Sequence, residues 1–386
     1  MKIYNHIAFK MGQKEKELAS YIKEGGNWQD IPLNVRDTRL DGIRKTGGRT
    51  TYYGRLRWDK PSYTISTYYN RVGNGCNLHP SQNRVISTRE AARLQSFPDD
   101  FRFVGTKTSI YKQIGNAVPP LLARYISTLI KPHLNSYNFV DLFAGCGGLS
   151  EGFIQNGFNL LAVNELDQNI MQTNIWNHSK YTDRENFILG DITSEEIKHK
   201  IFDACKNKSV DVILGGPPCQ GFSYAGWRNP DDKRNLLFRE FVSVVQNLKP
   251  KFFVMENVLG ILTMRNGETI KEIIKAFAEC GYFVHTPLKL NASEYGVPQR
   301  RKRVILIGCR DEIKIQTPSP LFSEDDIFLP KPITVYDAIS SLPSIDDGGG
   351  IDEIDYEFQY PTTYDLLMQK QIDFEKFYSM MLESRH

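Results

Sequence analysis

The feature that most constrains the fold is an alternation of short apolar segments with amphipathic ones between residues 138 and 310. Amphipathic stretches such as LFREFVSVVQNL at 237–248 and TIKEIIKAFAECG at 269–281 separate the apolar segments. This alternation predicts an α/β fold with a doubly wound, mostly parallel sheet, whose ligands bind beyond the carboxyl ends of the strands. The expected strands are NFVDLF at 138–143, FNLLAVNE at 158–165, NFILGD at 186–191, DVILGG at 211–216, KFFVMENV at 251–258 and RVILIGC at 303–309.

The segments on either side of this core are irregular. Residues 1–86 contain only short strand candidates such as SYTIST, and residues 311–386 are rich in Asp, Pro and Gly without clear periodicity. Each segment is short and lacks a continuous apolar face, so we expect neither to fold alone. We therefore expect one large domain and one smaller, irregular domain.

Positive charge is concentrated at the N-terminal end of the chain. Residues 1–112 hold 20 Lys and Arg against 10 Asp and Glu, residues 113–310 hold 23 against 19, and residues 311–386 hold 5 against 16. Aromatic residues such as Trp58 and Tyr63 lie within the basic segment. This combination is typical of a surface that binds nucleic-acid phosphates. An ordinary solvated face is an equally good explanation of the charge alone.

The cysteines and the apolar runs limit the other possibilities. The six cysteines include no Cys-x-x-Cys pair and no neighbouring His spacing that would form a zinc site, so we expect no metal and a reducing compartment. No apolar run reaches the length of a membrane span, and the opening MKIYNHIAFKMGQ lacks the features of a signal peptide. We expect no membrane association and a cytoplasmic location.

A glycine-rich loop follows the first expected strand. In VDLFAGCGG at 140–148, the glycines allow a tight turn that brings backbone N–H groups close to a ligand. Glu165 ends the next strand, where a carboxylate can accept hydrogen bonds from ribose hydroxyls. Because the loop is not GxGxxG, a nucleoside is favoured over a dinucleotide. A purely structural turn is the alternative for the loop alone.

Three further motifs place reactive or charged residues at strand ends. In GGPPCQGFS at 215–223, two prolines stiffen the turn and present Cys219 at the sheet edge, although a lone cysteine is more often a small buried residue. In MENV at 255–258, Glu256 is expected to be protonated or hydrogen-bonded, with helix capping as the alternative. QRRKR at 299–303, taken alone, is better explained as a solvated charge run.

Together and in this order, DLFAGCGG, GGPPCQGFS, MENV and QRRKRVILIG resemble the core motifs of the DNA cytosine-C5 methyltransferase family. STREAARLQSFPDDF at 87–101 and IYKQIGNAVPP at 110–120 resemble the family's last two motifs, yet here they come first. The resemblance covers nearly the whole chain and implies a circularly permuted member, an arrangement that proteins tolerate because termini lie at the surface.

The resemblance also implies a domain organisation. The fold of the central part would be that of S-adenosylmethionine-dependent methyltransferases. The segments would be 1–86 as the second part of the target-recognition domain, 87–137 as the permuted motifs that join it to the catalytic domain, 138–310 as the catalytic and cofactor-binding domain, and 311–386 as the first part of the target-recognition domain.

The family's reaction moves a methyl group from S-adenosylmethionine to carbon 5 of a specific cytosine in double-stranded DNA and leaves S-adenosylhomocysteine. By resemblance, Cys219 adds to carbon 6, Glu256 contacts and helps to protonate ring nitrogen 3, Arg303 holds the base oxygen, and Arg301 supports the loop and the DNA backbone. Such covalent catalysis divides one difficult step into easier ones. Because a duplex hides carbon 6, the base must be flipped out.

The cofactor pocket implied by the resemblance combines the glycine loop with residues at other strand ends and in one permuted motif. Asn116 and Cys219 are therefore expected to lie side by side. The pocket residues are Phe143, Gly145, Cys146, Gly148, Glu165, Leu166, Asp191, Ile192, Pro218, Leu237 and Asn116.

Three alternatives remain open. A transfer-RNA cytosine methyltransferase shares the motifs but has a small recognition region, whereas residues 311–386 and 1–86 leave room for sequence recognition in the major groove. A catalytically inactive DNA-binding relative would not need Cys219 and Glu256, and a dinucleotide oxidoreductase would need GxGxxG. By analogy, the partners are double-stranded DNA and a cognate restriction endonuclease, in the bacterial cytosol or nucleoid.

Overall fold

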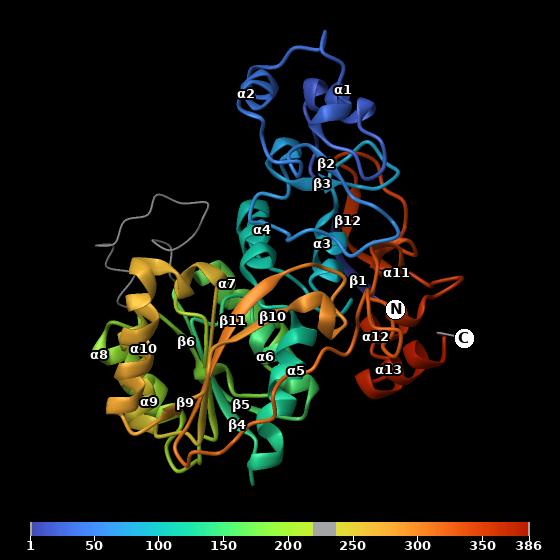
Figure 1. Cartoon of the computed structure of the whole chain (residues 1–386). Coiled ribbons are helices and arrows are strands. Elements are labelled where there is room, and N and C mark those ends of the chain that lie inside the picture. Colours follow the sequence, from blue (N-terminus) through green and yellow to red (C-terminus); the bar gives the residue numbers. More distant parts are fainter. Residues whose placement is uncertain (1, 219–236, 385–386) are drawn as a thin grey trace. The chain divides into compact units, whose positions relative to one another are not determined.

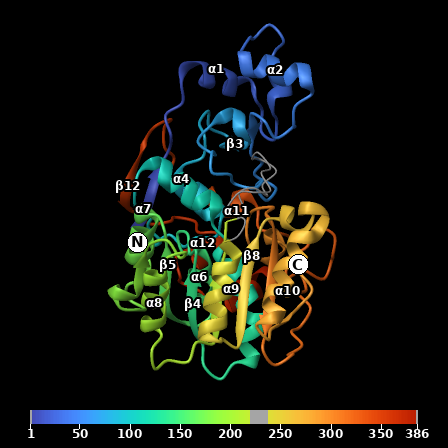
Figure 2. The same ribbon diagram turned by 90° about the vertical axis from the view of Figure 1, so that its left-hand side faces the viewer.

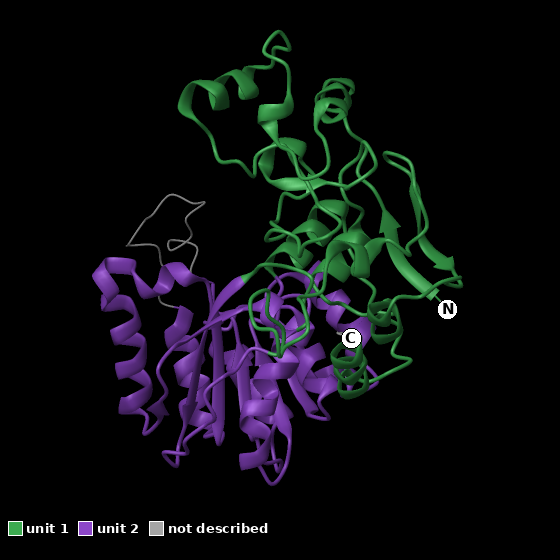
Figure 3. Cartoon of the chain, turned by 45° about the vertical axis from the view of Figure 1, so that its right-hand side comes forward, with its two compact units in different colours: residues 1–116, 296–301, 321–386 green, residues 117–295, 302–320 purple. Residues whose placement is uncertain are grey.

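The chain folds into two compact units. The structure, a computed structural model, describes residues 2–218 and 237–384. Both units contain segments that are far apart in the sequence (Figure 3). Unit 1 comprises residues 1–116, 296–301 and 321–386, and unit 2 comprises residues 117–295 and 302–320.

Unit 2 is built on an eight-stranded sheet with the order β10-β11-β8-β7-β4-β5-β6, and β9 pairs with β11. The strands β4 to β8 are mutually parallel, whereas β11 runs antiparallel to β8, β9 and β10. The strand order turns round at β4, which has β5 on one side and β7 on the other. The strands are β4 (Asn138–Leu142), β5 (Asn159–Glu165), β6 (Phe187–Leu189), β7 (Val212–Gly215), β8 (Phe252–Asn257), β9 (Phe283–Val284), β10 (Leu288–Asn291) and β11 (Lys302–Cys309).

Helices cover both faces of this sheet, which is why its strands are nearly continuous apolar runs (Figures 1 and 2). On one face, α8, α9 and α10 bury a core in which the rings of Phe253 and Phe277 stack at 3.8 Å. On the other face, α5 and α6 pack so closely that a Cβ at Gly152 would lie 2.3 Å from the Pro120 carbonyl oxygen. The predicted doubly wound α/β fold is confirmed. The helices are α5 (Pro120–Ile130), α6 (Gly148–Gln155), α7 (Gln168–His178), α8 (Glu195–Ala204), α9 (Leu237–Leu248) and α10 (Glu268–Glu279).

Unit 1 joins the two ends of the chain. Strand β1 (Lys2–Ile7) pairs antiparallel with β12 (Gly350–Asp355), with Lys2 opposite Asp355. A second small sheet pairs β2 with β3 in parallel. The remaining elements of unit 1 are α1 (Gln13–Tyr21), α2 (Thr38–Thr46), β2 (Gly54–Arg55), β3 (Cys76–Leu78), α3 (Thr88–Leu94), α4 (Lys107–Asn116), α11 (Val335–Ile339), α12 (Thr363–Met368) and α13 (Phe374–Glu383).

Buried arginines hold the segments of unit 1 together. Helix α3 starts with a capping box in which Ser87 and Glu90 satisfy each other's backbone N–H groups. On this helix, the buried Arg93 guanidinium binds Asp99 and Asp365, and thus connects a segment near residue 95 with one near residue 365. Charge that is buried to this degree requires such partners.

The C-terminal segment is more regular than its sequence pattern indicated. Residues 311–384 contain three helices and a strand, and helix α13 buries Phe374 and Phe377. In the described part of the chain, no helix has both the length and the apolar character needed to cross a membrane.

Candidate active site

The loop after β4 has the conformation of a tight, glycine-dependent turn. Phe143, Gly145 and Gly147 all have positive φ angles, of 53°, 56° and 89°. A Cβ at Gly147 would lie 2.5 Å from Asn174 Oδ1, so only glycine fits there, whereas a Cβ at Gly145 would have no neighbour within 4 Å. The Asn174 side-chain amide donates to the Gly145 carbonyl at 2.5 Å. The loop is therefore fixed from one side and open at Gly145.

Glu165 connects this loop to the end of β5. Its carboxylate accepts hydrogen bonds from the backbone N–H groups of Gly145 at 2.9 Å, Leu166 at 2.9 Å and Asp167 at 3.0 Å. Burial raises the pKa of Glu165, and the three N–H donors oppose that rise. The carboxylate is therefore held in one orientation beside the glycine loop.

The other residues expected around a nucleoside differ widely in exposure. Leu166 is 66% exposed and Asp191 is exposed, whereas Ile192 is buried in the apolar core. The Cys146 thiol is also buried, and burial raises its pKa. Because their side chains are buried, Cys146 and Ile192 can contact a ligand mainly through their backbone atoms. The exposed Leu166 side chain offers an apolar surface.

A second part of the candidate site lies where β7 and β8 end side by side. The Asn257 side-chain amide donates to the Pro217 carbonyl at 3.2 Å, and a Cβ at Gly216 would lie 3.2 Å from Glu256 Oε2. The segment that leads to Cys219 is thereby fastened to the end of β8. Pro218 is half-buried. Cys219 lies outside the described residues. Its expected proximity to Asn116 therefore stays a prediction.

Glu256 and Arg303 form an ion pair across neighbouring strands. The Arg303 Nε atom lies 2.6 Å from Glu256 Oε1, and each side chain is 12% exposed. The pairing of β8 with β11 brings the two residues together although β9 and β10 separate them in the sequence. This region therefore holds a carboxylate and a guanidinium, both nearly removed from water.

Arg301 and Asn116 belong to unit 1. The Arg301 side chain is fully buried and donates to the carbonyls of Ile65 at 3.2 Å and Gly115 at 2.8 Å. Its described bonds are thus to backbone oxygens, and they fasten the end of α4, where Asn116 is exposed. Leu237, the first residue of α9, belongs to unit 2 and is half-buried.

Sequence reasoning missed several residues that shape the site. Asn174 and His178 lie one turn apart on α7, and both occupy the space that a side chain at Gly147 would need. His178 also pairs with Glu151 at 3.3 Å. Their i, i+4 spacing was visible in the sequence, but nothing in it identified their partner. Asp141, at the start of the glycine motif, accepts a hydrogen bond from Ser150, and burial raises its pKa to about 7. Among the described residues, no group of three or more His, Cys, Asp or Glu side chains is arranged to hold a metal ion.

The fold and the site together define a class. A glycine loop after the first parallel strand, a fixed carboxylate after the second and a strand order that turns round between them are typical of α/β proteins that bind a nucleoside-containing cofactor. The family model described as C-5 cytosine-specific DNA methylase matches residues 2–132 and 137–383. The chain belongs to this family, as its motifs predicted.

Individual relatives match only part of the chain. It is 38% identical over 229 residues to the Type II methyltransferase M.XorII of Xanthomonas oryzae, covering 58% of this chain and 51% of that protein. It is 40% identical over 243 residues to M.DdeI of Desulfomicrobium norvegicum, covering 60% and 55%. A crystal structure described as a prophage-encoded DNA modification methyltransferase of E. coli is 35% identical, with a TM-score of 0.42, and the match covers 54% of this chain and 56% of that one. The chain thus spans about half the length of the curated relatives it matches.

Proposed function

We propose that this protein transfers a methyl group to carbon 5 of a specific cytosine in double-stranded DNA. The observation that carries the proposal is the ion pair between Glu256 and Arg303 at 2.6 Å, beside the segment Gly216–Pro218 that leads to Cys219. A carboxyl and a guanidinium held there suit the polar edge of a pyrimidine, which offers a ring nitrogen and a carbonyl oxygen. The relatives named above carry the names of Type II methyltransferases.

The site fits S-adenosylmethionine, which would supply the methyl group and leave as S-adenosylhomocysteine. Gly145 is open where a side chain would otherwise stand, Glu165 is fixed beside it, and Leu166 offers an exposed apolar surface. Backbone N–H groups of a tight loop and a carboxylate after the next strand suit a nucleoside with hydroxyl groups. The residues proposed to hold the cofactor are Phe143, Gly145, Cys146, Gly148, Glu165, Leu166, Asp191, Ile192, Pro218, Leu237 and Asn116.

In the proposed mechanism, the Cys219 thiolate attacks carbon 6 of a flipped-out cytosine and forms a covalent bond. Glu256, ionised in its pair with Arg303, first takes up a proton from solvent and passes it to ring nitrogen 3, so that the electrons displaced by the attack are accommodated and carbon 5 becomes nucleophilic. Arg303 orients Glu256 and binds the base oxygen. After methylation, a water molecule takes the carbon 5 proton, Cys219 leaves as the thiolate, and ring nitrogen 3 returns its proton to Glu256. Arg301 acts indirectly, because its buried guanidinium stabilises the segment around Gly115.

We further propose that the chain is circularly permuted, with residues 311–386 and 1–86 as the two parts of one recognition domain, 87–137 as the connection and 138–310 as the catalytic domain. The pairing of β1 with β12 supports this proposal, because it unites both ends of the chain within unit 1. The order of the motifs at 87–120 supports it as well.

The test is incubation of the full chain with methyl-labelled S-adenosylmethionine and, in parallel, unmethylated duplex DNA or transfer RNA. We expect label in DNA, at carbon 5 of cytosines within one sequence context. Label in transfer RNA alone would overturn the substrate class, and no transfer to either would favour an inactive DNA-binding relative. If DNA is the substrate, a cytosolic or nucleoid location and a cognate restriction endonuclease of the same specificity follow as expectations.

A duplex with 5-fluorocytosine at the target position, incubated with S-adenosylmethionine, tests the covalent step, because after methyl transfer the fluorine at carbon 5 cannot leave as a proton does. We expect a stable protein–DNA adduct with the unsubstituted chain and none with Cys219→Ser, since serine is a much weaker nucleophile. Cys280→Ser is the matched control, because Cys280 is a partly exposed residue at the end of α10. An adduct that persists in Cys219→Ser would contradict the mechanism.

A further inference from the structure

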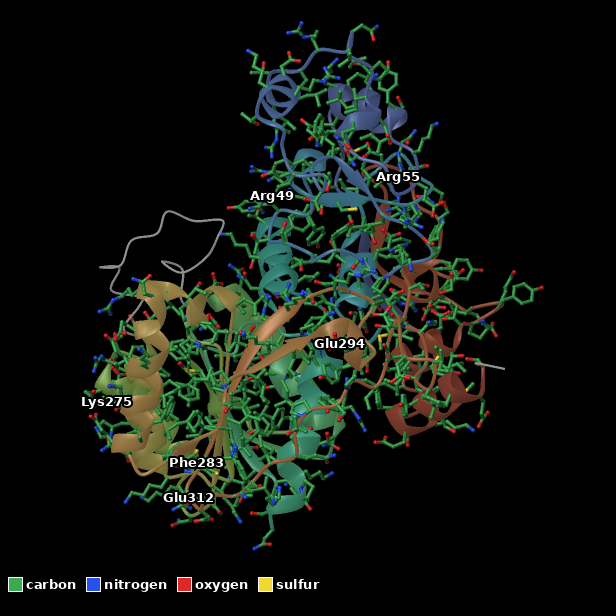
Figure 4. The ribbon with its side chains drawn as sticks, in the orientation of Figure 1. Arg49, Arg55, Lys275, Phe283, Glu294 and Glu312 are labelled. Atoms are coloured by element: carbon green, nitrogen blue, oxygen red, sulfur yellow. The ribbon has the colours of Figure 1, made fainter. Side chains whose placement is uncertain are left out.

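Arg49 differs from the other described arginines of unit 1 in the partners of its side chain. The other described arginines of the unit each donate a hydrogen bond, form an ion pair or contact an aromatic ring. Arg55, for example, is buried and donates to the carbonyls of Ile22 and His79. The Arg49 guanidinium is exposed and has no such partner among the described residues. Figure 4 shows Arg49 at the surface of unit 1.

The backbone that carries Arg49 is nevertheless held firmly. The Arg49 carbonyl accepts hydrogen bonds from the indole N–H of Trp28 at 3.2 Å and from the backbone N–H of Tyr52 at 3.0 Å. The preceding Gly48 packs so tightly that a Cβ would lie 2.6 Å from Ile43 Cγ2. A fixed backbone with a free side chain is the arrangement expected of a residue that meets its partner outside the protein.

The surroundings of Arg49 favour an anionic or electron-rich partner. Between Asp41 and Asp59 the chain contains no carboxylate and five basic residues. The guanidinium has five N–H donors in a planar fork and no acceptor. In the major groove, guanine presents two adjacent acceptors, O6 and N7, which match that fork, whereas adenine presents a donor beside its acceptor.

We propose that Arg49 recognises a guanine of the target sequence in the major groove. This inference rests on the proposed function. Contact with a phosphate would use the same donors but carries no sequence information, so the two kinds of contact differ in how loss of Arg49 changes sequence preference. Lys45, on the last turn of α2, is exposed and without a described partner, so it serves as the matched control for a phosphate contact.

The experiment uses the full chain and a library of duplexes with randomised bases around a cytosine, sequenced after bisulfite conversion. For Arg49→Ala, we expect methylation of the preferred sequence to fall roughly 5- to 150-fold, with the requirement for one particular guanine lost. Arg49→Lys should also lose that requirement, because an ammonium group lacks the fork. Lys45→Ala should lower methylation of all sequences alike and make it less sensitive to salt.

The outcomes separate this inference from the proposed function. If the unsubstituted chain methylates a defined sequence and Arg49→Ala keeps the same sequence preference, with full or uniformly lowered activity, the guanine assignment is wrong and the proposed function stands. If the unsubstituted chain methylates no DNA, both the guanine assignment and the proposed function are wrong. Thermal unfolding of each variant accompanies the assay, and we expect no change because Arg49 makes no side-chain bond to residues 2–218 or 237–384 that its loss would remove.

Discussion

Replacing Arg93 with methionine is expected to destabilise unit 1 by about 3–5 kcal/mol, the usual cost of leaving a buried charge without its partner. The side chains of Arg93, Asp99 and Asp365 are all 0% exposed. Arg93 donates to the two oxygens of Asp99 at 2.8 and 2.6 Å. Methionine fills a similar volume but supplies no donor, so the change isolates the loss of charge and hydrogen bonds.

The size of the destabilisation depends on how many hydrogen bonds each carboxylate keeps after Arg93 is replaced. Asp365 keeps bonds from the Ser341 hydroxyl and from the backbone and hydroxyl groups of Thr362. Within the described part of the chain, the Asp99 carboxylate accepts side-chain bonds only from Arg93. The cost therefore falls mainly on Asp99. The double variant Arg93→Met, Asp99→Asn should recover part of the loss, because it removes the uncompensated charge.

The assay is urea unfolding followed by the fluorescence of Trp28 and Trp58, both in unit 1, with the chain's other two tryptophans replaced by phenylalanine. For a slope of roughly 2 kcal/mol per molar urea, the midpoint should fall by roughly 2 M. Arg102→Met is the matched control, because its ion pair with Asp352 is 23% and 48% exposed and contributes about 1 kcal/mol or less. A shift no larger than that of the control, or a double variant less stable than Arg93→Met, would refute the reasoning.

Three further predictions concern unit 2 and its site. Glu256→Gln should lower the rate of methyl transfer by a factor of about 10² to 10⁴ while DNA binding persists; an unchanged turnover rate would remove Glu256 from the chemistry. Burial raises the pKa of Asp141 from 3.8 to about 7, so the folded state retains a proton that the unfolded state releases, and stability falls as pH rises through that window. Asp141→Asn should therefore be more stable than the unsubstituted chain above pH 7, by up to about 4 kcal/mol, and the advantage should vanish below about pH 4 in denaturant titrations. Gly152→Ala should destabilise unit 2 by about 1–3 kcal/mol, because its Cβ would meet α5, whereas Gly42→Ala, with open space around its Cβ, should stabilise α2 by up to about 1 kcal/mol; equal melting shifts would contradict this contrast.

The core of the fold could be predicted because its strands are buried on both faces. Each of the six expected apolar runs overlaps an observed strand, and Glu165 ends β5 as expected. Strands β9 and β10 were missed because they are mostly exposed or half-buried, with only Leu290 buried, and so do not form continuous apolar runs as the central strands do. The pairing of β1 with β12 also escaped prediction, since the register of distant polar strands is set by tertiary contacts.

The candidate site was predictable to the level of strand ends but not of side-chain partners. Glu256 and Arg303 were both expected at the sheet edge, yet their ion pair depends on β11 lying next to β8 after two intervening strands. The roles of Arg301 and Arg303 also diverge for a geometric reason. Arg303 lies within β11, whereas Arg301 precedes its first residue and turns into unit 1. The sequence placed the start of the strand between them, but it could not reveal that the Arg301 side chain binds the carbonyls of Ile65 and Gly115.

The pairing of β1 with β12 sets an order of events during synthesis. Residues 2–7 emerge from the ribosome before the other strands, but the strand that completes their hydrogen bonds spans residues 350–355, beyond every strand of the eight-stranded sheet. Domains generally fold as their residues become available, so the sheet of unit 2 can form while β1 is still unpaired. Arrest of translation before Gly350 should leave nascent chains with an assembled unit 2 and an unfinished unit 1.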